Sequence, residues 1–128
     1  MSAVPASSIE QTQALYQATL GKATRLTASS EEVKKLLAAG QTPVVVELPW
    51  GQVVNGVSHD RHQLIPTRVA GQRLYFINAL KTDVAPGTEI DGPGRGPKRR
   101  LEANGEESMA LSTFLTLFGR GGKALLPL

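Results

Sequence analysis

The feature that most constrains the fold is the middle stretch of residues 62–78, in which apolar and polar side chains alternate around a glycine. Alternation with a period of two indicates a half-buried strand on each side, and the Ala70-Gly71 pair between them predicts a tight β-hairpin. The apolar positions that predict a face packed on the core are Leu64, Val69, Leu74 and Phe76. Because a hairpin brings the far ends of its strands together, we expect His62 and Asn78 to lie close to each other.

The rest of the chain supplies helices and short strands against which the hairpin can pack. Pro near the first turn and Gly just beyond the end predict a helix over residues 5–20. Ser29 and Glu32 fit a capping box, which predicts a second helix that stops at Gly40. Further elements are expected as a β-branched strand at 43–48, a turn region around another short extended piece at 50–56, a short helix at 112–118 capped by Ser112 and a terminal strand at 123–128. This order predicts an α+β fold, with N-terminal helices packed on a small antiparallel sheet or half-barrel.

The chain is expected to form one domain, 1–128, with a single long polar loop. A length of 128 residues suits one modest core. Residues 83–107 are rich in Gly, Pro and Arg, and such a segment buries too little apolar area to fold as an independent unit. A basic cluster in this loop comprises Arg95, Lys98, Arg99 and Arg100. We expect it to be a flexible, solvated surface, with docking to phosphate, nucleic acid or an acidic protein as the alternative.

Composition excludes several classes of chemistry. The chain contains no cysteine, which rules out disulfides, thiolate zinc sites and iron–sulfur clusters. No cofactor and no metal are expected, because the His59-x-x-His62 spacing suits a helix rather than a loop that leads into a strand. An aromatic content of 5% offers little stacking surface, so nucleic acid is not an expected partner. No apolar run approaches the ~18 residues of a membrane span. With no signal peptide visible, we expect a cytoplasmic protein or a domain of a larger exporter or secreted protein.

The expected His62–Asn78 pair is the strongest candidate for chemistry. A side-chain amide can hold an imidazole in one tautomer and aim it at a nucleophile. The alternatives are a surface histidine beside a strand-ending asparagine, and His59 as the base in place of His62. Ser7 and Ser8 are candidate hydroxyl nucleophiles, although serine at a helix start is more often a cap.

The N-terminal segment Ala3-Val4-Pro5-Ala6-Ser7 opens the first predicted helix, and His62, Asn78 and a late helix around Phe114 follow in that order. This arrangement resembles the papain-like cysteine peptidase superfamily, in particular the double-glycine leader peptidases of bacteriocin exporters and the papain-fold toxin domains of bacteria. In those families a helix opens with Cys-Gly-Pro-Ala/Thr-Ser, which the N-terminal segment matches except at its first two positions. The resemblance covers most of the chain and implies a papain-like fold.

The resemblance also implies a function, which is cleavage of a peptide or isopeptide bond by a Cys–His–Asn triad. His62 is then the general base and Asn78 its orienter, while Trp50, if not simply part of the core, and His59 belong to the binding cleft. Ala3 stands at the nucleophile position, and without sulfur no acyl-enzyme can form. Ala3 is therefore either a deliberate replacement in an active enzyme or a natural loss in a domain that only binds a peptide or partner protein. A cognate immunity protein is an expected partner for the toxin branch.

Overall fold

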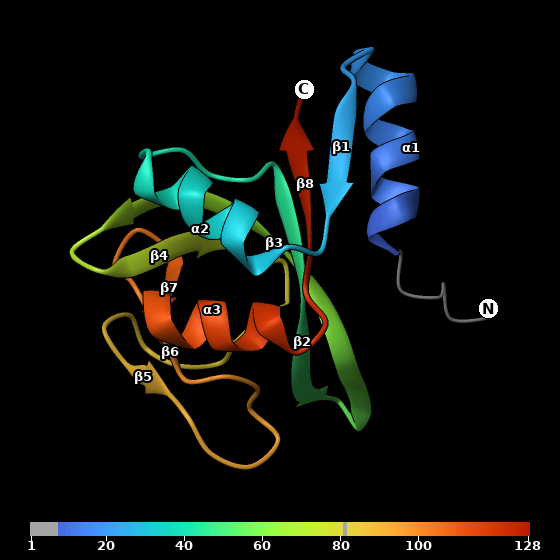
Figure 1. Cartoon of the computed structure of the whole chain (residues 1–128). Helices are drawn as coiled ribbons and strands as arrows, with labels where there is room; N and C mark the ends of the chain where they lie inside the picture. Colours follow the sequence, from blue (N-terminus) through green and yellow to red (C-terminus); the bar gives the residue numbers. More distant parts are fainter. Residues whose placement is uncertain (1–7, 81) are drawn as a thin grey trace.

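The computed structural model describes residues 8–80 and 82–128 and has an α+β fold (Figure 1). Three helices occur in this part of the chain: α1 (Ile9–Leu20), α2 (Ser30–Ala38) and α3 (Leu111–Gly119). The strands are β1 (Thr24–Thr27), β2 (Val45–Val54), β3 (Val57–Ala70), β4 (Arg73–Ile77), β5 (Glu89–Ile90), β6 (Arg99–Leu101), β7 (Glu107–Ala110) and β8 (Lys123–Pro127). The longest of these helices, α1, has 12 residues, whereas a bilayer needs ~20. No helix in the described part of the chain could therefore cross a membrane.

These strands form one eight-stranded sheet in the order β1-β8-β2-β3-β4-β7-β6-β5. The long strand β3 joins its two halves, since its first part pairs with β2 and its second part with β4, both antiparallel. The predicted hairpin of β3 and β4 is confirmed, although its turn lies one residue later than expected. The turn residues are Gly71 and Gln72, with φ of 55° and 62°, as a tight hairpin turn of type I′ requires.

The two faces of the sheet carry separate apolar clusters. The larger cluster lies under α2 and α3, which sit together on one face (Figure 1), and its helical members are Val33, Leu37, Phe114 and Phe118. The smaller cluster lies under α1, which packs on β1, β2 and β8, and its buried members are Ile9, Val45 and Leu125. A side chain on β2 or β3 therefore points either toward α1 or toward the layer formed by α2 and α3.

The first helix starts later than the sequence pattern predicts. Ser8 is extended, with φ −76° and ψ 159°, and it caps the helix instead of belonging to it. Its hydroxyl accepts the backbone N–H of Gln11, whose side chain in turn accepts the backbone N–H of Ser8. This capping box sets the start at Ile9, so the expected start at Pro5 is wrong. The expected end is confirmed by Gly21, which has φ 65°.

The other two helices also differ from expectation at their caps. Ser29 caps α2 as predicted, but the carboxylate of Glu32 bonds to Arg25 at 2.6 Å, so only half of the predicted capping box forms. Helix α3 begins just before Ser112, and no side chain caps it, so the predicted cap at Ser112 is wrong. The N-cap residue is instead Ala110, at the end of β7.

The polar segment 83–107 differs most from its predicted character. It contains β5, β6 and the first residue of β7, and it buries Ile90 and Arg99 in the interior. The short extended piece expected within 50–56 is present, but it is continuous with the preceding strand, because β2 runs on to Val54. Strand β1 has no counterpart in the sequence pattern.

Candidate functional site

The β3–β4 hairpin brings His62 and Asn78 together, as predicted. His62 Nε2 lies 2.6 Å from Asn78 Oδ1. His62 sits in β3 opposite Leu48 of β2, and Asn78 directly follows the last residue of β4. Both side chains are half-buried. Their proximity is thus confirmed, and their chemical roles stay predictions.

The hydrogen bonds of Asn78 fix which nitrogen of His62 carries the proton. Asn78 Nδ2 lies 3.1 Å from each carboxylate oxygen of Glu107, and only an amide N–H can donate to them. Asn78 Oδ1 is therefore turned toward His62, and it also accepts the backbone N–H of Leu80 at 2.9 Å. Because an amide oxygen only accepts, His62 Nε2 must carry the proton. The other ring nitrogen, Nδ1, is then unprotonated and basic.

Glu107, which orients Asn78, is itself held by a buried ion pair. Its carboxylate Oε1 accepts from Arg99 Nε at 2.5 Å, and the side chains of Arg99 and Glu107 are 0% and 4% exposed. The hydroxyl of Thr82 donates to Glu107 Oε2 at 3.1 Å. Both carboxylate oxygens therefore have donors besides Asn78, and their positions fix the Asn78 amide in turn.

Arg99 contradicts the expectation that the whole basic cluster is solvated. Its Nη1 group donates to the carbonyl oxygens of Arg95 and Pro97 at 2.7 and 2.9 Å. Its Nη2 group donates to Gln52 Oε1 and Thr82 Oγ1 at 3.2 and 3.4 Å. Together with the bond from Nε to Glu107, every N–H group of the guanidinium has an acceptor. These bonds offset the cost of burying the charge, and the loop folds over Arg99 to supply two of them.

Trp50 packs between the histidine and the buried ion pair. It is 5% exposed, and its ring centroid lies 5.2 Å from that of His62. The guanidinium of Arg99 lies 4.8 Å from the centroid of the same ring, which is a cation–π contact. The indole N–H donates to Gln52 Oε1 at 2.7 Å. Of the two alternatives for Trp50, core packing is the one observed.

The surroundings of His62 favour its neutral form. Burial lowers the pKa of His62 from the usual 6.5, and the hydrogen bond to Asn78 opposes this effect. Among nearby charges, His59 and Arg99 also lower this pKa and Glu107 raises it. At neutral pH the ring is therefore uncharged, which is the state in which Nδ1 can accept a proton.

A surface hollow of about 560 Å³ lies between His62 and the N-terminus of α1. We call it the His62 hollow, and its lining residues are Ser8, Thr12, Glu47, His59, Arg61, His62, Gln63 and Ala79. Its volume falls within the range of small-ligand pockets, about 300–1,000 Å³. His59, the alternative base and predicted binding residue, lines the same hollow as His62.

The helix α1 and the His62 ring belong to opposite faces of the sheet. Glu47 and Gln63 are cross-strand partners, and both contact α1. The backbone N–H of Ile9 donates to Glu47 Oε2 at 3.1 Å, and Thr12 Oγ1 donates to Gln63 Oε1 at 2.6 Å. His62 comes one residue before Gln63 in β3, so its ring points to the other face. The N-terminus of α1 and the His62 ring come together only at the His62 hollow, which both of them line.

The N-terminus of α1 already has an anionic partner. The buried carboxylate of Glu47 accepts its first backbone N–H and pairs with Arg61 at 2.7 Å. A carboxylate here is stabilised by the helix dipole, which is the effect that would otherwise favour a thiolate. Ala3, the predicted nucleophile position, lies outside the described residues. Of the candidate hydroxyl nucleophiles, Ser7 also lies outside them, whereas Ser8 lines the His62 hollow.

Sequence reasoning missed the acidic residues that organise this region. Glu47 interrupts the apolar run Val44-Val45-Val46, and Glu107 opens a strand whose next two residues are fully buried. A carboxylate in a strand that is otherwise buried needs a cation or several donors. The presence of Glu47 and Glu107 in such strands was therefore the sequence signal that cationic partners lie nearby. These partners are Arg61 and Arg99.

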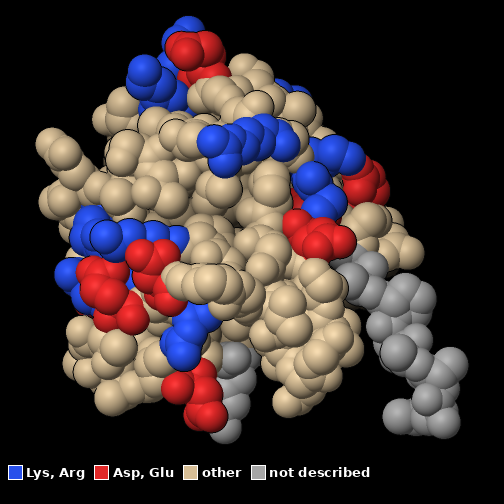
Figure 2. All heavy atoms as spheres, turned by 90° about the horizontal axis from the view of Figure 1, so that it is seen from below, with Lys and Arg blue, Asp and Glu red and all other residues tan. Residues whose placement is uncertain are grey.

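Neither a protein-family model, nor a curated protein, nor a solved structure matches this chain. Assignment of the site therefore depends on its geometry. Figure 2 shows one face of the molecule, on which basic and acidic side chains are interspersed among uncharged ones. Among the described residues, this face offers no continuous basic surface of the kind that binds nucleic acid.

Proposed function

We propose that this chain is a papain-like domain in which His62 and Asn78 form the base half of a Cys–His–Asn hydrolytic site, inactive here because Ala3 stands at the nucleophile position. The observation that carries the proposal is the Asn78 amide, which Glu107 holds so that His62 Nδ1 is left unprotonated. In the complete site, a thiol gives its proton to Nδ1, and the thiolate attacks the carbonyl carbon of a peptide or isopeptide bond. The protonated His62 then gives that proton to the leaving amine, while Nε2 keeps its bond to Asn78.

Restoring the thiol tests the proposal. The Ala3→Cys variant should contain a thiol whose pKa is well below the usual value of about 8.5, because His62 takes its proton. The rate of alkylation by iodoacetamide, measured against pH, gives this pKa. The matched control is Ala3→Cys combined with His62→Gln, in which the thiol pKa should return to its ordinary value.

A second cysteine variant locates the nucleophile position. Ser8→Cys places a thiol at the N-cap of α1, where the residue lines the His62 hollow. If Ser8→Cys rather than Ala3→Cys shows the lowered, His62-dependent pKa, the thiol belongs at the helix cap and the alignment of Ala3 with the family's cysteine is wrong. Ordinary thiol pKa values in both variants would contradict a hydrolytic site.

Glu47 favours a second candidate function, a binding module without chemistry. Its carboxylate occupies the N-terminus of α1, and a thiolate beside it would be opposed by the like charge. In this case the His62 hollow holds a peptide of a substrate or partner protein. Peptides selected from a random library on the unaltered chain should bind much more weakly to a His59→Glu variant, because His59 lines the hollow. Equal binding to both chains would place the peptide elsewhere.

A further inference from the structure

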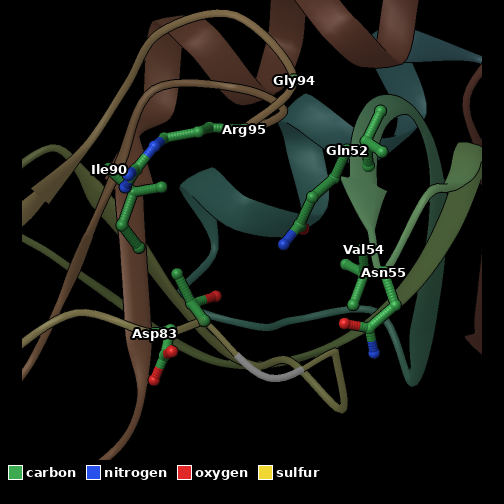
Figure 3. A pocket seen from close by; sticks show the side chains of 9 residues that line it. Gln52, Val54, Asn55, Asp83, Ile90, Gly94 and Arg95 are labelled. Atoms are coloured by element: carbon green, nitrogen blue, oxygen red, sulfur yellow. The ribbon is translucent and has the colours of Figure 1, made fainter.

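A second hollow lies on another part of the molecule, between the end of β2 and the β5–β6 loop (Figure 3). We call it the Gln52 hollow, and its lining residues are Gln52, Val53, Val54, Asn55, Thr82, Asp83, Ile90, Gly94 and Arg95. It shares none of these residues with the His62 hollow. Its volume of about 280 Å³ is just below the range of drug-sized pockets, about 300–1,000 Å³, and suits a group of amino-acid size.

Gln52 is a buried side chain whose amide nitrogen is directed into this hollow. The residue is 6% exposed, and its Oε1 accepts from Trp50 Nε1 and Arg99 Nη2, at 2.7 and 3.2 Å. Indole and guanidinium groups only donate, so the amide cannot be reversed and Nε2 must point the other way. The amide end projects into the middle of the hollow in Figure 3. Within residues 8–80 and 82–128, Nε2 donates no hydrogen bond.

The β5–β6 loop is fastened so that the backbone of Arg95 lies beside Gln52, while the Arg95 side chain extends along the hollow toward Ile90 (Figure 3). Gln52 and Arg95 form an isolated antiparallel bridge, and Val53 donates its backbone N–H to Gly94 at 2.8 Å. The loop can approach β2 this closely because Gly96 has φ +78° and no side chain, and a Cβ there would lie 3.3 Å from the Trp50 carbonyl oxygen. Arg95 is an exposed residue, and its guanidinium forms no ion pair with the described residues.

We propose that the Gln52 hollow binds a carboxylate group, with Gln52 Nε2 donating to it and Arg95 supplying the positive charge. A carboxylate matches both groups, since it accepts from an amide N–H and from a guanidinium. Asp83 lines the same hollow and repels a second negative charge, so the remainder of the ligand is neutral or cationic. The carboxylate comes either from the C-terminus of a peptide or from a free small organic acid. This site does not depend on the function proposed for His62.

The test is an NMR titration that follows the side-chain N–H₂ signals of Gln52 at constant ionic strength. N-acetylglycine, which carries the terminal carboxylate of a peptide, should shift these signals in a saturable way, whereas N-acetylglycinamide should not. Acetate distinguishes the two sources: N-acetylglycine binds more tightly than acetate if the ligand is a peptide terminus, and equally if it is a free acid. A saturable shift with N-acetylglycinamide, or none with either carboxylate, would overturn the proposal.

Variants of exposed residues keep the test independent of folding. Arg95→Gln should weaken N-acetylglycine binding about tenfold, the typical value of one charge-assisted hydrogen bond. Asp83→Asn should strengthen the binding, because it removes the repulsion. Lys98→Gln is the matched control, since Lys98 is an exposed cation of the same loop that does not line the Gln52 hollow. Equal affinities of the Arg95→Gln and Lys98→Gln variants would also overturn the proposal.

Discussion

Asn78 forms hydrogen bonds at both ends of its amide, and each end has a separate consequence. The nitrogen donates to Glu107, which prevents the amide from turning over. The oxygen accepts from His62 and from the Leu80 backbone, which holds the proton of His62 on Nε2. Through Asn78, the buried carboxylate of Glu107 thus determines which nitrogen of the His62 ring carries the proton.

The lowered pKa of His62 predicts a pH dependence of stability. Well above pH 7 the ring is neutral in both the folded and the unfolded chain and contributes no slope. As the pH falls through the usual 6.5, the unfolded chain binds a proton that the buried ring resists. The free energy of unfolding should therefore decrease between about pH 7 and pH 5. Urea unfolding at several pH values measures this slope.

The substitution His62→Gln should flatten that slope, and His59→Gln should largely retain it. His59 is a suitable control because it lies in the same strand and lines the same hollow. Carboxylates whose pKa is lowered by partners, such as Glu102 and Glu106, lose their contribution only below the usual 4.5 and leave this window clear. An unchanged slope in His62→Gln would show that His62 is not buried in its neutral form.

At the element scale, the ion pair between Arg99 and Glu107 holds β6 and β7 in position. The two strands pair Arg100 with Ser108 and Leu101 with Glu107, so Arg99 and Glu107 meet near the end of the ladder. The short strand β6 has few apolar residues to anchor it. The buried guanidinium of Arg99 takes over that role by bonding to β2 and β7 at once.

The substitution Arg99→Met should therefore destabilise the chain far more than Arg100→Met. Removal of one partner of a buried ion pair typically costs about 3–5 kcal/mol, because the other charge is left in the interior. Arg100 is the matched control, since its side chain is 35% exposed and solvent screens its ion pair with Glu102. Urea unfolding of both variants measures the difference. Losses of similar, small size would contradict a structural role for the Arg99–Glu107 pair.

Structural features that depend on neighbouring residues in the sequence could be predicted. Features that depend on partners far away in the sequence could not. The hairpin follows from alternation and a glycine turn, and so the closeness of His62 and Asn78 was accessible from the sequence. The burial of Arg99 was not, because its partners lie on β2, on β7 and in its own loop. The start of α1 carried a local signal, the Ser8-x-x-Gln11 capping box, which outweighs the helix-start preference of Pro5.

At the scale of the whole molecule, the sheet brings together a closed circuit of buried and half-buried contacts. His62 bonds to Asn78, Asn78 to Glu107, and Glu107 to Arg99. Arg99 bonds to Gln52 and lies over Trp50, whose ring returns to contact His62. The residues of this circuit lie on or directly next to five strands, so no short sequence motif indicates it. The His62 hollow and the Gln52 hollow both border this circuit, the first through His62 and the second through Gln52.

We infer that the circuit holds the proton of His62 on Nε2 and leaves Nδ1 basic. A long-range ¹H–¹⁵N correlation spectrum of the ¹⁵N-labelled protein, recorded above the pKa of His62, assigns the tautomer directly. We predict a protonated, pyrrole-type Nε2 and an unprotonated, pyridine-type Nδ1. A spectrum with the proton on Nδ1, or with both tautomers in rapid exchange, would contradict the claim.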